Sequence, residues 1–155
     1  MASDDPTANF QITPISAPAE WNGLAFKGLY MYHTPLGPNA NQAPIIPNQG
    51  FGRTVVNNWE VYDGPGSNAK VVARAQDLHI RAGNWICSFS LVFENERFSG
   101  STLQVMGKIV EFGEWAIVGG TGEFAMATGV ISKRLYEQRS DGNIIELTIH
   151  AFCPL

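Results

Sequence analysis

The sequence predicts an all-β protein, a single barrel of about eight antiparallel strands, from three observations. Sixteen glycines and nine prolines divide the 155 residues into short apolar segments. Several of these segments alternate apolar and polar residues with a period of two, which is typical of half-buried strands. No segment has a convincing long helical pattern. Closure into an up-and-down or closely related barrel would leave no exposed sheet edges.

The first half of the chain contains the strands expected at residues 24–33, 54–62, 70–80 and 86–94. The first is followed by a loop at residues 34–52, which is rich in proline and asparagine and too long for a simple turn. The second ends at an Asp-Gly-Pro-Gly turn at residues 63–66. In the fourth, Phe89, Leu91 and Phe93 alternate with smaller or more polar neighbours, as expected for a strand.

The second half contains the strands expected at residues 102–110, 114–119, 124–136 and 143–152. Residues 125–127 favour a helix, but the β-branched residues that follow and the interruption at Gly129 favour a strand. The dipeptide Asp141-Gly142 is typical of a hairpin turn and joins the last two strands.

The composition fits one globular domain. Apolar residues make up 45% of the chain and charged residues 15%, so a disordered chain is excluded. The net charge is -4 and there is no basic stripe, so we expect no nucleic-acid partner. The apolar runs are too short for a transmembrane helix, and we expect no membrane contact. We expect a flexible N-terminal segment at residues 1–22 and the barrel domain at residues 23–155.

Candidate chemical groups are few. The glycine-rich residues 119–122 follow a strand, but no Lys-Ser/Thr pair follows and no βαβ unit surrounds them, so a tight turn is favoured over a phosphate site. His33, His79 and His150 lack the spacing of metal ligands. Neither cysteine lies beside a base in the sequence. We therefore predict no metal, no cofactor and no catalytic residue.

The tryptophans allow two interpretations. Trp59 lies between Asn58 and Glu60, and Trp85 follows Asn84. An exposed indole beside amide and carboxylate groups can bind a sugar. Packing in the core or at a subunit interface is the alternative, and we favour it for each tryptophan taken separately.

The two cysteines, Cys87 and Cys153, are predicted to be free thiols. The N-terminus is acidic and has no apolar stretch of the kind found in secretory signals. We therefore expect a cytoplasmic protein, in which disulfides are rare. A single bridge between the two cysteines is the alternative.

Several segments, in this order along the chain, resemble the dirigent family. They are residues 29–33 (LYMYH), 61–65 (VYDGP), 72–76 (VARAQ), 100–107 (GSTLQVMG) and 118–129 (VGGTGEFAMATG). The resemblance extends over about residues 24–153. It implies an eight-stranded antiparallel barrel that is usually a homotrimer. Many members hold phenoxy radicals or a quinone methide so that coupling or cyclisation gives one stereoisomer.

The resemblance also implies that the acidic pocket of coupling members is replaced here. The two acidic positions of the family fall on Thr34 and Ile109, and the pocket arginine falls near Gly113. Without these groups the pocket would lack an acid and base for a quinone methide. A binding or auxiliary domain is therefore expected rather than an enzyme.

Residues 56–59 (VNNW) and the C-terminal residues 152–155 (FCPL) resemble a narrower branch, the dirigent domain of grass chimeric jacalins. In these defence and stress proteins a mannose-binding jacalin-related lectin domain follows. The branch implies a non-catalytic, carbohydrate-binding dirigent domain. One alternative is an auxiliary protein that directs stereoselective coupling of monolignol radicals. Another is a trimerising scaffold that makes an attached lectin domain multivalent.

We expect the ligand-binding residues to be Tyr32, Thr34, His79, Arg81 and Trp85. The period of two places Tyr32 and Thr34 on one face of a strand, and His79 and Arg81 on one face of another. Trp85 lies on the loop that follows. His79 and Arg81 would donate hydrogen bonds to sugar hydroxyls, and Trp85 or Tyr32 would stack on the ring.

Overall fold

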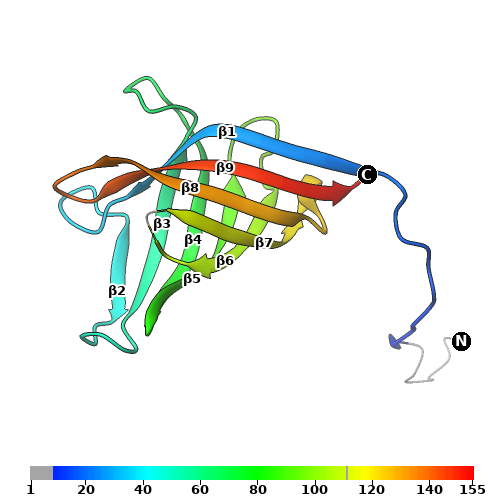
Figure 1. The fold of residues 1–155 in the computed structure, drawn as a ribbon, viewed down its shortest axis with the longest axis horizontal. Coiled ribbons are helices and arrows are strands. Elements are labelled where there is room, and N and C mark those ends of the chain that lie inside the picture. Colours follow the sequence, from blue (N-terminus) through cyan, green and yellow to red (C-terminus); the bar gives the residue numbers. More distant parts are fainter. Residues whose placement is uncertain (1–8, 111) are drawn as a thin grey trace, which may run out of the picture.

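The computed structural model describes residues 9–110 and 112–155. The first part of the expected segment 1–22, residues 1–8, lies outside this range, as does residue 111. The described residues form one antiparallel sheet and a short 3₁₀ helix (Figure 1). The elements are β1 (Trp21–His33), β2 (Gln42–Ile46), β3 (Thr54–Tyr62), β4 (Val71–Ala82), β5 (Asn84–Phe93), β6 (Thr102–Lys108), β7 (Gly113–Thr121), η2 (Gly122–Phe124), β8 (Thr128–Gln138) and β9 (Asn143–Pro154).

The sheet closes on itself into a barrel. Its strand order is β1-β9-β8-β7-β6-β5-β4-β3-β2, and β1 also pairs with β3. That pairing places Tyr30 opposite Tyr62 and Met31 opposite Val61. β1 and β3 to β9 therefore form an eight-stranded antiparallel barrel, which confirms the predicted fold class. The strand interpretation of residues 124–136 is also confirmed from Thr128 onward, after the short η2 helix.

The expected loop at residues 34–52 was only partly correct, because it contains β2. This strand pairs with β3 and places Gln42 opposite Asn57 and Ala43 opposite Val56. β1 pairs with β3 only near the C-terminal end of β3, so the rest of the β3 edge is free for β2. Pro44 hid this strand from the sequence pattern, and proline is tolerated in β2 because β2 is an edge strand.

The barrel has two different ends. The end that we call the closed end carries the loops at residues 63–70, 94–101 and 122–127, and its interior is filled by aromatic rings. Phe93 and Phe124 lie 5.0 Å apart between ring centroids, and Phe98 lies 5.1 Å from Phe124. The ring of Phe26 lies within about 6 Å of all three. This edge-to-face and tilted packing leaves no polar side chain in the cluster.

Two glycines of the expected turn at residues 119–122 shape the closed end. Gly122 has φ of +65°, as a tight turn requires. A Cβ atom on Gly120 would lie 2.1 Å from the carbonyl oxygen of Phe124. The turn interpretation therefore holds only at Gly122, because residues 119–121 still belong to β7. Gly120 instead allows β7 to pack closely against the end of η2.

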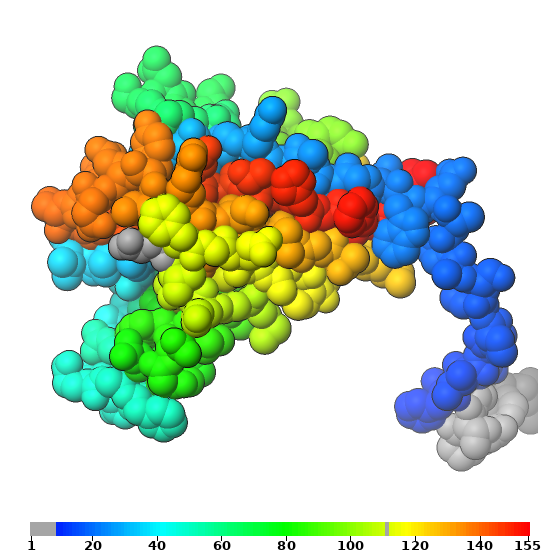
Figure 2. All heavy atoms as spheres, viewed as in Figure 1, coloured from blue at the N-terminus to red at the C-terminus, as the bar shows by residue number. Residues whose placement is uncertain are grey.

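The other end, which we call the open end, is formed by β2, the β4–β5 hairpin tip and the turn at residues 139–142. Backbone hydrogen bonds tie Gly52 and Arg53 to Arg81, so the tip of the hairpin lies beside the segment after β2. Figure 2 shows these two segments projecting together from the body of the barrel. They extend the barrel wall beyond its interior core.

The N-terminal residues before β1 do not pack on the barrel. Residues 9–20 are exposed and lead away from the barrel body (Figures 1 and 2). In the described part of the chain, no helix is long and apolar enough to cross a membrane.

Candidate functional site

A cavity enters the barrel from the open end. Its inner part has a volume of about 160 Å³ and its outer part about 340 Å³, and His33 and Ile109 line both parts. The inner part is lined by Met31, His33, Trp59, Ile109, Val110, Trp115, Lys133, Asn143 and Ile145. We call the two parts together the barrel-mouth cavity. Its walls are mainly aromatic and aliphatic, with nitrogen-bearing groups at a few points.

Two histidines hold fixed positions in this cavity. His33 donates from Nδ1 to Oδ1 of Asn143, at 3.1 Å. His79 donates from Nδ1 to Oδ1 of Asn57, at 3.0 Å, and Asn57 donates in turn to the carbonyl of Ala75. Burial lowers the pKa of both rings, and burial together with the neighbouring His33 lowers the pKa of His79 to about 4. Both imidazoles are therefore neutral at pH 7 and can serve as hydrogen-bonding groups.

Lys133 contributes a buried amine to the inner part of the cavity. The residue is 4% exposed. The Nζ atom donates to the carbonyl oxygen of Lys108 at 2.8 Å and lies 3.9 Å from the centroid of the Trp115 ring. Burial lowers the pKa of Lys133 to about 8, while the nearby Cys87 raises it slightly. Burial also raises the pKa of Cys87 to about 11, so the thiol is neutral.

The indole rings of Trp59 and Trp115 are wall elements of the cavity. They are 1% and 2% exposed. Trp59 donates from Nε1 to Gln42 of β2 at 2.9 Å, and Trp115 donates to the carbonyl of Lys108 at 3.2 Å. The core interpretation of these two tryptophans is therefore confirmed, and an exposed sugar-stacking role for Trp59 is wrong. β2 fixes the rim by supplying the acceptor for Trp59.

A second, polar depression lies on the outer face of the barrel. It has a volume of about 350 Å³ and is lined by Tyr32, Thr34, Asn39, Ala40, Glu60, Tyr62, Arg139 and Asp141. We call it the outer groove. The rings of Tyr32 and Tyr62 lie 4.7 Å apart, and the guanidinium of Arg139 lies 5.7 Å from the centroid of Tyr32. Aromatic faces and charged groups thus occur together here in contact with water.

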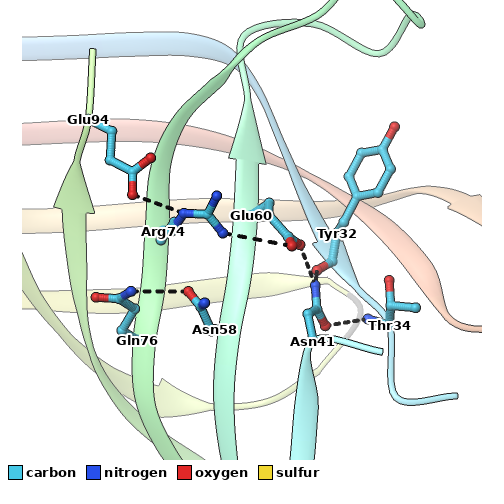
Figure 3. Close-up of polar contacts among 8 residues, drawn as sticks. All are labelled: Tyr32, Thr34, Asn41, Asn58, Glu60, Arg74, Gln76 and Glu94. Carbon is cyan, nitrogen blue, oxygen red and sulfur yellow. Dashed lines mark hydrogen bonds and ion pairs between the residues drawn. The ribbon is translucent and has the colours of Figure 1, made fainter. Parts of the chain in front are cut away.

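A row of polar contacts supports one wall of the outer groove (Figure 3). Asn41 donates from Nδ2 to Glu60 at 2.6 Å and to the carbonyl of Tyr32 at 2.7 Å. Arg74 lies 3.8 Å from Glu60 and donates to Glu94 at 2.9 Å. Figure 3 shows that these side chains lie across neighbouring strands on one face of the sheet. The row fixes the carboxylate of Glu60 at the groove.

The structure separates the five predicted site residues. His79 and Trp85 line the outer part of the barrel-mouth cavity, whereas Tyr32 and Thr34 line the outer groove. Arg81 is exposed at the hairpin tip, 5.9 Å from the Trp85 ring centroid. The five residues therefore do not line one pocket. The reason is strand alternation: His33 points into the barrel, so its neighbours Tyr32 and Thr34 point outward.

The sequence analysis missed Lys133, Asn57 and Asn143 as inward-facing polar groups. A signal for the first existed, because Lys133 alternates with Ile131 and Leu135, which both contact the core. The same alternation places Asn57 between Val55 and Trp59. Asn143 begins β9 two residues before the inward-facing Ile145, so the alternation of that strand also places it on the inner face.

The other candidate residues take ordinary positions. Ile109 lines the cavity and Gly113 begins β7. His150 is exposed on the outer face, and both cysteines are buried thiols. Within residues 9–110 and 112–155, no group of three or more His, Cys, Asp or Glu side chains could hold a metal ion.

The pattern of motifs and the closed barrel agree with a family-level match. The family described as "Dirigent-like protein" matches residues 27–152. The chain belongs to the dirigent family. The narrower similarity to grass jacalin chimeras is not part of this match.

Named relatives of the chain are dirigent proteins and pterocarpan synthases. "Dirigent protein 11" of Arabidopsis thaliana is 29% identical over 119 residues, which cover 72% of this chain and 60% of that protein. "Pterocarpan synthase 1" of Glycine max is 30% identical over 107 residues, covering 64% of this chain and 56% of that protein. The chain thus spans less than two thirds of the length of either dirigent relative.

Solved structures show the same architecture. A pterocarpan synthase dirigent protein aligns with a TM-score of 0.77 at 24% identity, covering 94% of this chain and 99% of that one. A pyocyanin demethylase aligns with a TM-score of 0.52 at 14% identity, covering 83% and 100%. At these identities the similarity concerns the fold alone.

Proposed function

We propose that this dirigent protein binds an oxygenated aromatic molecule, a phenolic of the monolignol class, in the barrel-mouth cavity. The observation that carries the proposal is the composition of the inner wall. Trp59, Trp115, Met31 and Ile145 offer flat and aliphatic surfaces, which suit a planar ring better than a sugar with hydroxyls on every side. Small-molecule sites of this kind are mostly apolar with a few placed polar groups.

The polar groups of the cavity support binding and orientation rather than acid catalysis. They are the imidazoles of His33 and His79, the amide of Asn143 and the amine of Lys133. Among the described residues that line the cavity, none is an aspartate or glutamate. We therefore propose an auxiliary role, in which the protein holds the phenolic or its radical while the oxidising step is performed by a separate oxidant.

The test is the stereochemistry of coupling. Coniferyl alcohol is oxidised by a one-electron oxidant with and without the protein, and the dimers are separated by chiral chromatography. We expect an enantiomeric excess that rises with protein concentration. A racemic product at every concentration would overturn the proposal.

A matched pair of variants ties the result to the cavity. Ile109→Trp fills space that both parts of the cavity share and is expected to abolish the excess. Val118→Trp adds a similar volume on the outer face, where Val118 is exposed, and is expected to leave the excess unchanged. Equal behaviour of the two variants would place the activity elsewhere.

A second candidate, carbohydrate binding, is favoured by the outer groove. Paired tyrosine rings stand beside Glu60, Arg139 and Asp141 there, and such a combination can stack on a pyranose and hydrogen-bond to its hydroxyls. A glycan array followed by calorimetry tests this function. Tyr32→Ala should remove any binding seen, while Ile109→Trp should preserve it. No binding at millimolar sugar would exclude this candidate.

The assembly proposals are independent of both sites. We propose a homotrimer, an attached jacalin-related lectin domain in the full-length protein and a cytoplasmic location, as the resemblance implies. Light scattering on the purified chain tests the first of these. A monomer at high concentration would contradict the trimer and the scaffold role that depends on it.

A further inference from the structure

Lys133 is unusual among the charged residues of the chain. It lies in β8 with its side chain on the same face as Ile131 and Leu135, pointing into the barrel. Its side chain is buried, and it lines the inner part of the cavity. Lysine is almost never fully buried unless a partner compensates its charge. A buried ammonium group such as that of Lys133 therefore requires a partner that compensates its charge.

The described part of the chain offers Lys133 no carboxylate. None of the ion pairs among the described residues includes it. Its Nζ atom donates one hydrogen bond, to the carbonyl of Lys108, and faces the π-surface of Trp115. An ammonium group has three N–H donors. The carbonyl and the ring use two directions and leave one donor for a group inside the cavity.

The other titratable groups around the cavity are two histidines and a cysteine, which are neutral at pH 7, and Arg53, which is a cation at the outer part. Cys87 faces Lys133 from β5, and burial raises the pKa of its thiol. His33 lies on β1 and His79 on β4, and burial lowers the pKa of both imidazoles, so all three groups are neutral at pH 7. Arg53 lines the outer part of the cavity and donates to the carbonyl of Pro47. Among the described residues that line the inner part of the barrel-mouth cavity, Lys133 is therefore the one that carries a positive charge at pH 7.

We propose that Lys133 binds the anionic oxygen of the aromatic ligand, so that the cavity selects a phenol in its phenolate form over its neutral ethers. The inference rests on the proposed function and names the feature of the ligand that the cavity recognises. The ring would lie between the apolar walls formed by Met31, Trp59 and Ile145. A phenolate would bring a negative charge to the buried ammonium, and the charge-assisted hydrogen bond is strong in a site sheltered from water.

The test uses 4-nitrophenol, whose phenolate absorbs visible light while its neutral phenol does not, and its methyl ether 4-nitroanisole. Both are titrated with the intact chain at pH 7. We expect 4-nitrophenol to bind as the phenolate, with its apparent pKa lowered by about one unit or more on the protein. The dissociation constant of 4-nitroanisole should be at least about tenfold higher than that of 4-nitrophenol.

Three variants separate the possible sources of this preference. Lys133→Met keeps approximately the volume of the side chain and should abolish both the increase in phenolate absorbance that the protein causes and the preference over the ether. Arg53→Gln removes the other cation near the cavity and should leave both unchanged. Lys70→Met, at an exposed position far from the cavity, should also have no effect. Folding of each variant is verified by its unfolding transition.

The outcomes distinguish the inference from the function on which it rests. If coniferyl alcohol and both nitro probes bind while Lys133→Met leaves the preference unchanged, the inference is overturned and the aromatic site stands. A loss of preference in Arg53→Gln rather than Lys133→Met would also overturn it. If none of the three aromatic compounds binds the wild-type chain, the proposed function and the inference both fail.

Discussion

At the closed end of the barrel, four phenylalanines fill the interior, whereas at the open end the same strands carry histidines, asparagines and a lysine on their inner face. β5 illustrates the change within one element. Phe93 packs into the aromatic cluster at one end of the strand, while Trp85 lines the cavity at the other. The wall is continuous, but its inner surface changes from uniformly apolar to mixed.

The difference between the two ends indicates that the closed end mainly stabilises the fold, whereas the open end carries the candidate site. Apolar groups at the closed end contribute by leaving water and need no particular partner. Each polar group at the open end must be hydrogen-bonded to offset the loss of water, and each described one is, through pairs such as His33–Asn143 and His79–Asn57. Such buried polar groups are costly, and sites that break the apolar pattern are commonly functional.

Truncation at the closed end is expected to have the largest effect. Phe93→Ala removes a buried ring that packs against three other rings, and it should lower the free energy of unfolding by about 3–5 kcal/mol. Denaturant unfolding measures this loss, and Phe152→Ala, at a ring that is 56% exposed on the outer face, is the control. A loss below about 1 kcal/mol would show that the closed end is not the stabilising end.

Acid should destabilise the open end through His79. Burial lowers the pKa of His79 from 6.5 to about 4, so the unfolded chain binds this proton more readily than the folded one. Stability is therefore retained above pH 6.5 and falls as the pH drops toward 4, by about 3 kcal/mol at most. Unfolding measured between pH 7 and 4 should show this decline.

His79→Gln serves as the matched variant for the acid effect. Glutamine keeps a polar side chain near Asn57 but has no proton to gain, so its unfolding free energy should depend less steeply on pH over the same range. His150→Gln, at an exposed histidine, should leave the slope unchanged. Equal slopes for wild type and His79→Gln would show that the buried ring does not determine acid sensitivity.

The fold could be predicted from the sequence because its determinants are local. Period-two alternation and turn residues such as Asp141-Gly142 specify the strands and hairpins, and the eight barrel strands appear where expected. β2 could not be predicted, since it contains Pro44 and forms only because a free edge of β3 lies beside it. That condition depends on where β1 departs from β3, which is a property of the tertiary structure.

The candidate site was less predictable for a related reason. Alternation indicates which residues share a face but not which face is the inner one for a polar stretch. Tyr32 and His33 are adjacent, and only barrel closure decides that His33 enters the cavity while Tyr32 faces the outer groove. Lys133 was overlooked because a lysine in a strand is normally solvent-exposed, although its apolar neighbours at alternate positions indicated otherwise.

Replacing Lys133 measures how much its buried ammonium group lowers the free energy of unfolding. At pH 7 the lowered pKa of Lys133, about 8 against 10.5, corresponds to about 3 kcal/mol of lost stability. Lys133→Met removes that cost but leaves the carbonyl of Lys108 with one hydrogen bond fewer. We therefore expect the unfolding free energy to rise by about 2 kcal/mol.

The pH dependence of this gain has a definite sign. Between pH 8 and 10.5 the unfolded chain keeps the Lys133 proton and the folded chain loses it, so wild-type stability from this group rises with pH. The advantage of Lys133→Met should shrink over that range. The nearby thiol of Cys87 titrates at higher pH in the folded state, so the comparison is best made below pH 9. A destabilised variant at pH 7 would contradict the comparison of the two ends.

The smallest effect is expected on the outer face, where charges remain in contact with water. Arg74 joins Glu60 and Glu94, and its side chain is 29% exposed. Arg74→Gln should lower the unfolding free energy by about 1 kcal/mol or less, because exposed ion pairs contribute little. High salt should reduce the difference further by screening. Since Asn41 also holds Glu60, any sugar binding at the outer groove should persist in this variant.

A loss of unfolding free energy above about 2 kcal/mol in Arg74→Gln would instead mean that the outer row of charges behaves like a buried network. The contrast with Lys133 inside the barrel would then no longer hold.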